Sequence, residues 1–244
     1  MSIIRVQQNM NRLGLPSLFL YIEGEDIMKN YKILIITSCT GKKKFNPPNK
    51  LFINDFKDMN ILKHRELELE EYKCKAIDMY TGMQHINLVE GLNIIRDTFE
   101  NIIVDVNIIS AGYGLLREND IIVPYEVTFN NMKSTELNEW SNYLNIHNAT
   151  IESMKGYDIV IFLLGGKYLK ALQLPLENNE NQRVIFLETK QEDATSFSYG
   201  LVGLKGYLMK ILFKHIAENG VEIFEDIYNN PKVITDILNK YRKK

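Results

Sequence analysis

The chain has 244 residues, of which 45% are hydrophobic and 25% charged, so it is long enough to form one large domain with a substantial core. Its formal net charge of −2 argues against a protein whose whole surface binds nucleic acid. Two cysteines, Cys39 and Cys74, occur without CxxC or zinc-ligand spacing, which predicts neither disulfides nor a metal site and favours a reducing, cytoplasmic location. No apolar stretch approaches the about 18 residues that span a bilayer, and no signal-peptide pattern is recognisable, so we expect no membrane association.

The first 30 residues differ in composition from the rest of the chain. Amide side chains precede the apolar run Leu18–Ile22, which then meets an acidic stretch. We expect residues 1–30 to form an N-terminal extension that packs on the main domain or joins a partner protein or a second copy of the chain, and partial disorder is equally compatible with the sequence. Residues 31–218 then form the α/β domain that binds ligand or catalyses, and residues 219–244 form a helical tail.

The first strand of the α/β domain leads directly into polar residues. The apolar run Lys32–Thr37 has strand length and ends in Ser38, Cys39, Thr40 and Gly41, followed by three lysines. Ligands of parallel α/β sheets bind beyond the carboxyl ends of the strands, so this junction is a predicted site.

Helices are predicted on either side of a short motif that follows. The charged stretch Lys63–Glu71 indicates a solvated helix. The apolar spacing from Met83 to Phe99 predicts a second helix, which returns the chain to the next strand in a right-handed crossover. Tyr80 and His85 lie at the start of this second helix.

The second strand, Asp105–Ser110, ends in an unusual loop over Ala111–Leu116. Gly112 and Gly114 flank Tyr113, so the backbone can approach a ligand closely while the ring offers a stacking face.

The remaining elements repeat the pattern. A helix is predicted from Ser134, a third strand over Tyr157–Leu164 ends in Gly165 and Gly166, and a fourth strand over Arg183–Leu187 ends in Glu188 and Thr189. Further helices are predicted over Gly203–Phe213 and, split by Asn229–Pro231, in the tail. This order predicts an α/β fold, a three-layer sandwich around a mainly parallel sheet of about four to five strands, glycosylase-like or Rossmann-like.

Two interpretations stay open for the polar residues after the first strand. Cys39 beside lysines is either a reactive thiolate, with His85 as its base, or a structural buried cysteine. Lys42 and Lys43, with the Thr40–Gly41 turn, either hold a phosphate or carboxylate or are exposed loop lysines. The sequence contains no GxxxxGK[ST] motif, which argues against P-loop nucleotide hydrolysis.

The aromatic loop suggests a planar ligand. Tyr113 is predicted to stack on a base, with Tyr125 as the opposite wall and Asp120 or Glu126 as base or hydrogen-bond acceptor, although aromatic residues at strand ends also serve simply as core.

Taken together in this order, the motifs Ser38–Lys43, Tyr80–Gly82, Ser110–Leu116, Val123–Tyr125 and Gly165–Tyr168 resemble the peroxide-stress YaaA-like domain family of bacteria and phages, whose function is unknown. The first motif is also similar to the Cys-Ser-x-x-Lys motif in the catalytic domain of archaeosine synthase, with Cys39 and Lys43 at the matching positions. That enzyme has Pro-Tyr after its lysine, whereas this chain continues with Lys44–Pro48. The resemblance implies an α/β domain that handles a base, with a fold similar in outline to glycosylases.

The sequence thus predicts an enzyme acting on a nucleobase, a nucleotide or a base in nucleic acid, at a glycosidic bond or an exocyclic position, without a cofactor. The alternatives are a noncatalytic nucleotide- or DNA-binding module of a stress or phage-defence system, and a thiol redox enzyme centred on Cys39. The predicted catalytic residues are Cys39, Lys43 and Asp120, and the predicted substrate-binding residues are Ser38, Thr40, Lys42, Tyr80, His85, Ser110, Gly112, Tyr113, Gly114, Tyr125, Gly165 and Gly166.

Overall fold

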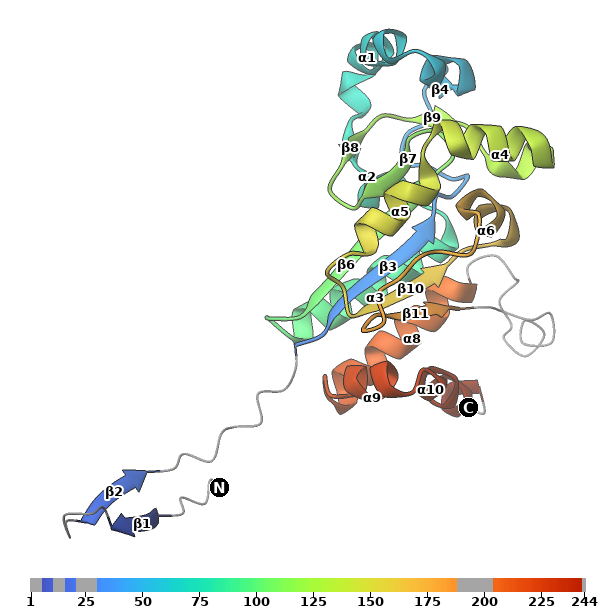
Figure 1. The fold of residues 1–244 in the computed structure, drawn as a ribbon. Coiled ribbons are helices and arrows are strands. Elements are labelled where there is room, and N and C mark those ends of the chain that lie inside the picture. The colour runs from blue at the N-terminus through green and yellow to red at the C-terminus, as the bar shows by residue number, and fades with distance from the viewer. Residues whose placement is uncertain (1–5, 11–15, 21–29, 188–203, 243–244) are drawn as a thin grey trace.

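A five-stranded sheet forms the centre of the structure, a computed structural model that describes residues 6–10, 16–20, 30–187 and 204–242. The strand order is β11-β10-β3-β6-β7 (Figure 1). The first four strands run parallel, and β7 is antiparallel to β6. The strands are β11 (Arg183–Phe186), β10 (Ile159–Leu163), β3 (Lys32–Ser38), β6 (Ile103–Ser110) and β7 (Gly114–Arg117).

The central strands are apolar because both of their faces are covered. Ile33 to Ile36 of β3 are fully buried, and Ile35 is paired in register with Val106 of β6 and Ile161 of β10. Continuous apolar runs of this kind are typical of parallel strands between helical layers.

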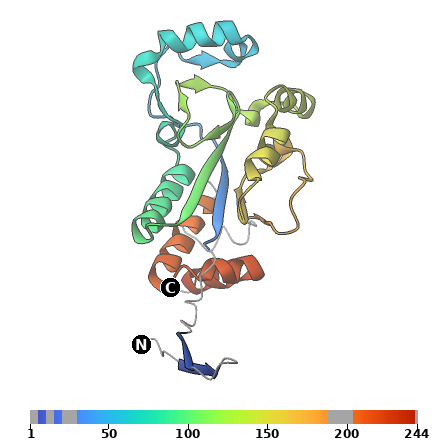
Figure 2. The ribbon, with the colours of Figure 1, turned by 60° about the vertical axis from the view of Figure 1, so that its left-hand side comes forward.

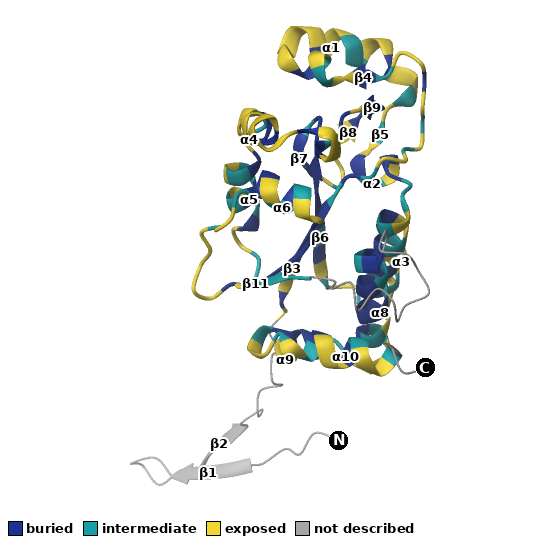
Figure 3. Cartoon of the chain, turned by 90° about the vertical axis from the view of Figure 1, so that its right-hand side faces the viewer, coloured by how far each residue is buried: buried dark blue, intermediate teal, exposed yellow. Residues whose placement is uncertain are grey.

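Two helical layers enclose the sheet (Figure 3). One consists of α3 (Met83–Thr98) and α8 (Leu204–Asn219), and the other contains α4 (Ser134–Tyr143), α5 (Ile146–Met154) and α6 (Gly166–Leu172). The structure therefore confirms the predicted α/β three-layer sandwich.

Glycines allow α3 and α8 to pack very closely. A Cβ atom added at Gly206 would lie 1.9 Å from the carbonyl oxygen of Gln84, and one added at Gly91 would lie 2.8 Å from the Cα of Lys210. Backbone therefore meets backbone in this layer, with no room for a methyl group at either glycine.

A group of short elements lies beyond the carboxyl ends of β3 and β6 (Figure 1). Within this group β4 pairs with β9 in parallel, and β5 pairs with β8 antiparallel. Figure 2 shows the same group above the sheet from another side. The elements, in which η denotes a 3-10 helix, are β4 (Leu51–Phe52), η1 (Ile53–Lys57), α1 (Met59–Glu68), η2 (Glu70–Tyr72), β5 (Cys74–Lys75), α2 (Ala76–Met79), β8 (Ile121–Ile122), β9 (Tyr125–Glu126) and η3 (Phe129–Asn131).

The C-terminal helices α9 (Ile223–Asn229) and α10 (Lys232–Arg242) lie near the opposite end of the sheet (Figure 1). Phe224, Ile227, Ile234 and Ile237 are buried in the same hydrophobic core as the sheet. These helices therefore belong to the packed body. Among the first 29 residues, β1 (Val6–Met10) pairs antiparallel with β2 (Pro16–Leu20), and the other residues lie outside the described part.

Most of the predicted elements are confirmed, but the short elements β4, β5, α2, β8 and β9 were not predicted, and other segments differ. The segment predicted as a loop over Ala111–Leu116 is a tight turn followed by β7, and Gly114 provides the turn with a φ of +77°. Helix α5 was not predicted. Glu188 and Thr189, predicted at the end of the fourth strand, lie outside the described residues, as does the start of the helix predicted from Gly203. In the described part of the chain, no helix has the length and apolarity required to cross a membrane.

Candidate functional site

The carboxyl ends of the parallel strands bring Cys39 and the residues after β6 and β10 together. The Cys39 amide donates a 2.9 Å hydrogen bond to the carbonyl of Ile109 in β6. Its sulfur lies 3.0 Å from the hydroxyl of Tyr168, which is in the first turn of α6, just after Gly165. The segments around Cys39, Ser110 and Gly165 thus meet at one edge of the sheet.

Cys39 lies among buried tyrosines. It is only 8% exposed, and it lies close enough to Tyr80, Tyr125 and Tyr168 to influence the pKa of their hydroxyls electrostatically. Burial, followed by the proximity of Cys39, raises the pKa of all three tyrosine hydroxyls above the ordinary value. These hydroxyls therefore stay neutral at physiological pH and can donate hydrogen bonds.

A chain of hydroxyl groups connects the turn after β6 to Tyr80. The Ser110 hydroxyl accepts the amide protons of Gly112 and Tyr113 at 3.1 and 3.0 Å and donates to the Tyr125 oxygen at 2.7 Å. The hydroxyls of Tyr125 and Tyr80 are 2.8 Å apart. Because two backbone amides anchor Ser110, the positions of Tyr125 and Tyr80 are linked to the turn itself.

Two of the predicted motifs are joined directly by hydrogen bonds. The Thr40 hydroxyl donates to the Lys42 carbonyl at 2.9 Å and accepts the Gly82 amide at 3.1 Å. The Thr81 amide also donates to the Lys42 carbonyl, and Lys43 forms an antiparallel bridge with Tyr80. A Cβ atom at Gly82 would lie 2.6 Å from the Cβ of Thr40, so glycine is required for this close approach.

A cavity of about 360 Å³ opens beside these motifs. The Lys43 ammonium lies 4.4 Å from the centre of the Tyr125 ring, and burial lowers the pKa of Lys43. Glu126 is the carboxylate at this cavity, and its oxygen lies 3.9 Å from the Lys50 ammonium. The cavity is lined by Gly41, Lys42, Lys43, Phe45, Asn46, Lys50, Thr81, Tyr125 and Glu126.

Tyr113 packs against other aromatic rings. Its ring centre lies 5.0 Å from that of Phe56 and 5.5 Å from that of Tyr125, both edge to face. A base between Tyr113 and Tyr125 needs two stacking distances of about 3.5 Å each, so the predicted sandwich is absent from this conformation. The Tyr113 hydroxyl donates to Glu66 at 3.0 Å, and a Cβ atom at Gly112 would lie 2.7 Å from the Phe56 ring. Stacking of a ligand on Tyr113 stays a prediction.

Asp120 lies in a turn away from the cavity lining. Its carboxylate accepts the Arg117 amide at 2.7 Å, and its carbonyl accepts the Ala76 amide. Among the described residues, no hydrogen bond or ion pair joins the Asp120 carboxylate to the groups around Cys39. Its predicted catalytic role is therefore unsupported by contacts, and Glu126 is better placed.

His85 is engaged elsewhere in the structure. Its Nε2 donates to the Ile77 carbonyl at 2.6 Å, and burial lowers the pKa of the ring. Its Nδ1 is buried without a hydrogen-bond partner in the described part of the chain. The ring contacts Tyr80 edge to face, and no hydrogen bond connects it to Cys39 in that part. The structure thus gives no support to His85 as the base of Cys39.

The remaining predicted residues lie at the same edge. Ser38 ends β3, and a Cβ atom at Gly165 or Gly166 would meet nothing within 4 Å. A Cβ atom at Gly114 would lie 3.0 Å from the carbonyl oxygen of Leu144. Glycine is therefore required at Gly114, by the positive φ of its turn, whereas a side chain would find free space at Gly165 and Gly166.

The predicted site residues did not include Lys50, Phe45 or Tyr168, although Tyr168 belongs to the predicted motif Gly165–Tyr168. Tyr168 was available from the sequence because it stands in the first turn of a helix that starts at a strand end, where side chains face the same edge of the sheet. Lys50 and Phe45 lie in a loop whose path the sequence pattern does not define.

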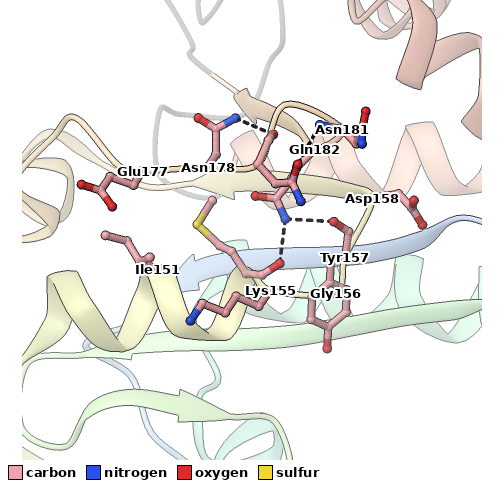
Figure 4. A pocket seen from close by; sticks show the side chains of 11 residues that line it. Ile151, Lys155, Gly156, Tyr157, Asp158, Glu177, Asn178, Asn181 and Gln182 are labelled. Carbon is pink, nitrogen blue, oxygen red and sulfur yellow. Dashed lines mark hydrogen bonds between the residues drawn. The ribbon is translucent and has the colours of Figure 1, made fainter.

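A larger cavity, of about 570 Å³, lies at the amino end of β10 (Figure 4). The Gln182 side chain donates to the carbonyls of Met154 and Tyr157 at 2.7 and 2.9 Å, and Asp158 precedes β10. Because sites in parallel sheets lie at the carboxyl ends of the strands, we place the candidate site at the Lys43 cavity.

Comparison with known proteins identifies the family. Residues 68–194, which are more than half of the chain, match the family of unknown function DUF6884. The chain belongs to this family. The match begins after Cys39 and Lys43, and includes Tyr80, Ser110, Tyr125 and Tyr168.

The chain is also similar to proteins named UPF0246. It is 24% identical to one from Limosilactobacillus reuteri (strain DSM 20016) over 176 residues, which are 67% of this chain and 64% of that protein. It is 25% identical to one from Shewanella oneidensis over 155 residues, which are 61% of this chain and 58% of that protein. The chain thus spans less than two thirds of the length of these relatives. This similarity agrees with the predicted resemblance to YaaA-like proteins.

Proposed function

We propose that this DUF6884 protein is an enzyme that acts on a nucleobase or a nucleotide, either at the glycosidic bond or on a base in nucleic acid. The observation that carries the proposal is the composition of the cavity beside Lys43. Lys42, Lys43 and Lys50 meet there with the rings of Phe45 and Tyr125.

Such a cavity suits a ligand that combines negative charge with a planar ring. Lysines bind phosphate as point charges, and aromatic side chains stack on bases. Base stacking contributes about 1–3 kcal/mol for each base, so the lysines have to supply the remainder of the affinity.

The groups around the cavity supply candidate catalytic roles. Glu126 is the general acid or base, because its carboxylate lines the cavity. The hydroxyl chain from Ser110 through Tyr125 to Tyr80 supplies neutral donors for charge that develops on the substrate. Cys39, which lies behind the residues that line the cavity, is either a nucleophile or a structural residue, and the similarity of its motif to archaeosine synthase favours the first role.

One observation favours a second function, a noncatalytic nucleotide- or DNA-binding module of a stress or phage-defence system. Cys39 is only 8% exposed, which limits access of a substrate to its sulfur, and the half-exposed Glu126 is paired with Lys50. In that case the N-terminal extension would join a partner protein or a second copy of the chain. In both cases we propose a cytoplasmic location, since both cysteines are free.

Turnover of nucleotides and oligonucleotides, with products identified by mass spectrometry, tests the enzyme proposal. We expect release of a base or a change in base mass with the wild-type protein, and loss of product with Lys43→Ala and Glu126→Gln. Lys63→Ala, on the exposed face of α1, and Cys74→Ser are matched controls and should keep the activity. Binding of nucleotides with no product from any variant would overturn the enzyme proposal in favour of the binding module. Activity that persists in Lys43→Ala would remove this cavity as the site.

A further inference from the structure

Among the lysines that line the candidate site, Lys43 is the one whose amine lies over an aromatic ring, that of Tyr125. We propose that Lys43 is a covalent nucleophile that forms an imine with the carbonyl carbon of a phosphorylated substrate, of the class of open-chain sugar phosphates. This deepens the proposed function, on which it rests for the placement of a nucleotide-derived substrate in the cavity of about 360 Å³.

The position of Lys43 is well defined. Its backbone is bridged to Tyr80, and its ammonium lies over the face of the Tyr125 ring, 4.4 Å from the ring centre. Tyr125 is itself fully buried and held by Ser110 and Tyr80. The Lys43 side chain therefore packs against a fixed aromatic ring and lines the cavity next to it.

Lys43 lacks the partner that would keep it permanently charged. Within residues 30–187 and 204–242, no carboxylate forms an ion pair with its ammonium, and no acceptor forms a hydrogen bond with it. Glu126 is instead paired with Lys50 at 3.9 Å. A lysine held against a ring loses less on deprotonation than one paired with a carboxylate, and a neutral amine is the form that attacks carbonyl groups.

The charged groups that face Lys43 act in both directions. Burial is the largest influence and lowers the pKa of Lys43, and Lys50 acts in the same direction. Cys39 and Glu126 raise the pKa, but they do not outweigh the burial. The Tyr125 ring attracts the ammonium and so favours the charged form of Lys43, in opposition to burial. The net result is a larger neutral fraction at neutral pH than in an ordinary lysine.

The other cations of the cavity explain why the substrate should carry a phosphate. Lys42 is exposed at the cavity, and Lys50 lies on its wall, so both remain available as cations when Lys43 is neutral. In the reaction the neutral amine adds to the carbonyl carbon, and the proton that the nitrogen loses passes to the former carbonyl oxygen, which gives a carbinolamine. Loss of one water molecule then gives the imine, and addition of water releases the carbonyl compound. No oxidant or reductant is required.

Reductive trapping with an aldehyde tests this inference without knowledge of the substrate. Wild-type protein is incubated with pyridoxal 5′-phosphate at pH 7.5, reduced with sodium borohydride, and the modified lysines are mapped by mass spectrometry. Each pH unit by which the pKa of Lys43 is lowered gives about ten times more free amine. Because burial lowers the pKa of Lys43, we expect several-fold more modification of Lys43 than of the neighbouring exposed Lys42 and Lys44.

Two comparisons make the result specific. Pyridoxal without its phosphate should modify Lys43 several-fold less, and inorganic phosphate should protect Lys43 from pyridoxal 5′-phosphate. Lys43→Arg keeps the charge but cannot form an imine, so modification at position 43 should vanish without a matching increase at Lys42 or Lys50, whereas Lys63→Arg should leave the modification of Lys43 unchanged.

The outcomes separate this inference from the proposed function. Modification spread evenly over the exposed lysines, or centred on Lys42, would overturn the imine role. If nucleobase turnover were observed without selective trapping, the proposed function would stand and this inference would fail. Selective trapping at Lys43 without turnover of any nucleobase would support the imine role and point to sugar phosphates alone.

Discussion

Replacing Ser110 by alanine tests whether the hydroxyl chain holds the turn after β6 in place. The Ser110 hydroxyl is fully buried and makes three hydrogen bonds: it accepts two backbone amide protons and donates to Tyr125. Ser110→Ala leaves the amides of Gly112 and Tyr113 without this acceptor, and it deprives Tyr125 of a donor.

The expected cost follows from the number of groups left unpaired. A hydrogen bond of this kind contributes about 1 kcal/mol net, and a buried group left unpaired costs about 1–3 kcal/mol. With two amides and one hydroxyl affected, we expect the free energy of unfolding to fall by about 3 kcal/mol. For a chain of this size that corresponds to a decrease of about 6–12 °C in melting temperature.

The assay uses the single tryptophan of the chain. Trp140 is buried, and its indole donates a 2.7 Å hydrogen bond to the carbonyl of Ala111, the residue after Ser110. Urea unfolding followed by Trp140 fluorescence therefore reports both global stability and this turn. Ser153→Ala is the matched control: this hydroxyl donates to the Thr150 carbonyl within α5, and its loss should change stability by about 0.5 kcal/mol or less.

A double-mutant cycle with Tyr125→Phe shows whether the effect passes through the chain. Because each substitution removes the same Ser110–Tyr125 bond, the double variant should lose about 1 kcal/mol less than the sum of the single variants. A cost for Ser110→Ala as small as that of Ser153→Ala, or costs that simply add, would refute the reasoning.

Three further predictions concern other parts of the molecule. Gly206→Ala places a methyl group against the Gln84 carbonyl and should cost about 1–3 kcal/mol in urea unfolding, whereas Gly166→Ala, with nothing within 4 Å, should change stability little; equal effects would contradict the close packing of α3 and α8. Burial lowers the pKa of His85, so the unfolded state takes up the proton first as the pH falls below about 6.5, and stability decreases. His85→Gln should therefore weaken the acid dependence of the urea midpoint. His64→Gln, at an exposed histidine, should leave that dependence unchanged. Burial and the hydrogen bond to Asp105 raise the pKa of Tyr157 to about 12. Between pH 10 and 12 the unfolded state therefore loses this proton first, and the stability of the folded state falls as the pH rises. Tyr157→Phe should reduce that loss of stability, and an unchanged pH profile would count against the shift.

The strands were predictable because their apolar runs have a defined length and end in small polar residues. The bounds of β3, β6, β10 and β11 follow from this pattern to within two residues, as does the edge at which Cys39 and Ser110 meet. Strand β7 was not predictable in the same way, because Gly114–Arg117 is short and its pairing with β6 depends on the turn at Gly114.

The partners of the site residues were much less predictable than their positions. Tyr113 and Tyr125 were both placed near the site, but only the structure shows that the two rings touch each other, edge to face with 5.5 Å between their centres. Asp120 follows a predicted site motif, yet the reversal of the chain in β7 carries it down the sheet into a turn with Arg117. Periodicity gives the direction of a strand and says nothing about which side chains fill the space at its end.

The start of α3 shows how segments far apart in the sequence position the candidate site. The Gln84 side chain donates to the Thr37 hydroxyl of β3 and to the Leu163 carbonyl of β10, at 3.2 and 3.1 Å, while its own carbonyl is pressed against Gly206 of α8. Gly82, two residues earlier, binds Thr40 and thereby the segment that carries Lys43. Because these contacts act on one turn of helix, a shift of α8 would move the Thr40–Gly82 junction, and with it the amine over the Tyr125 ring. The α3–α8 contact and the Thr40–Gly82 junction are therefore linked through the first turn of α3.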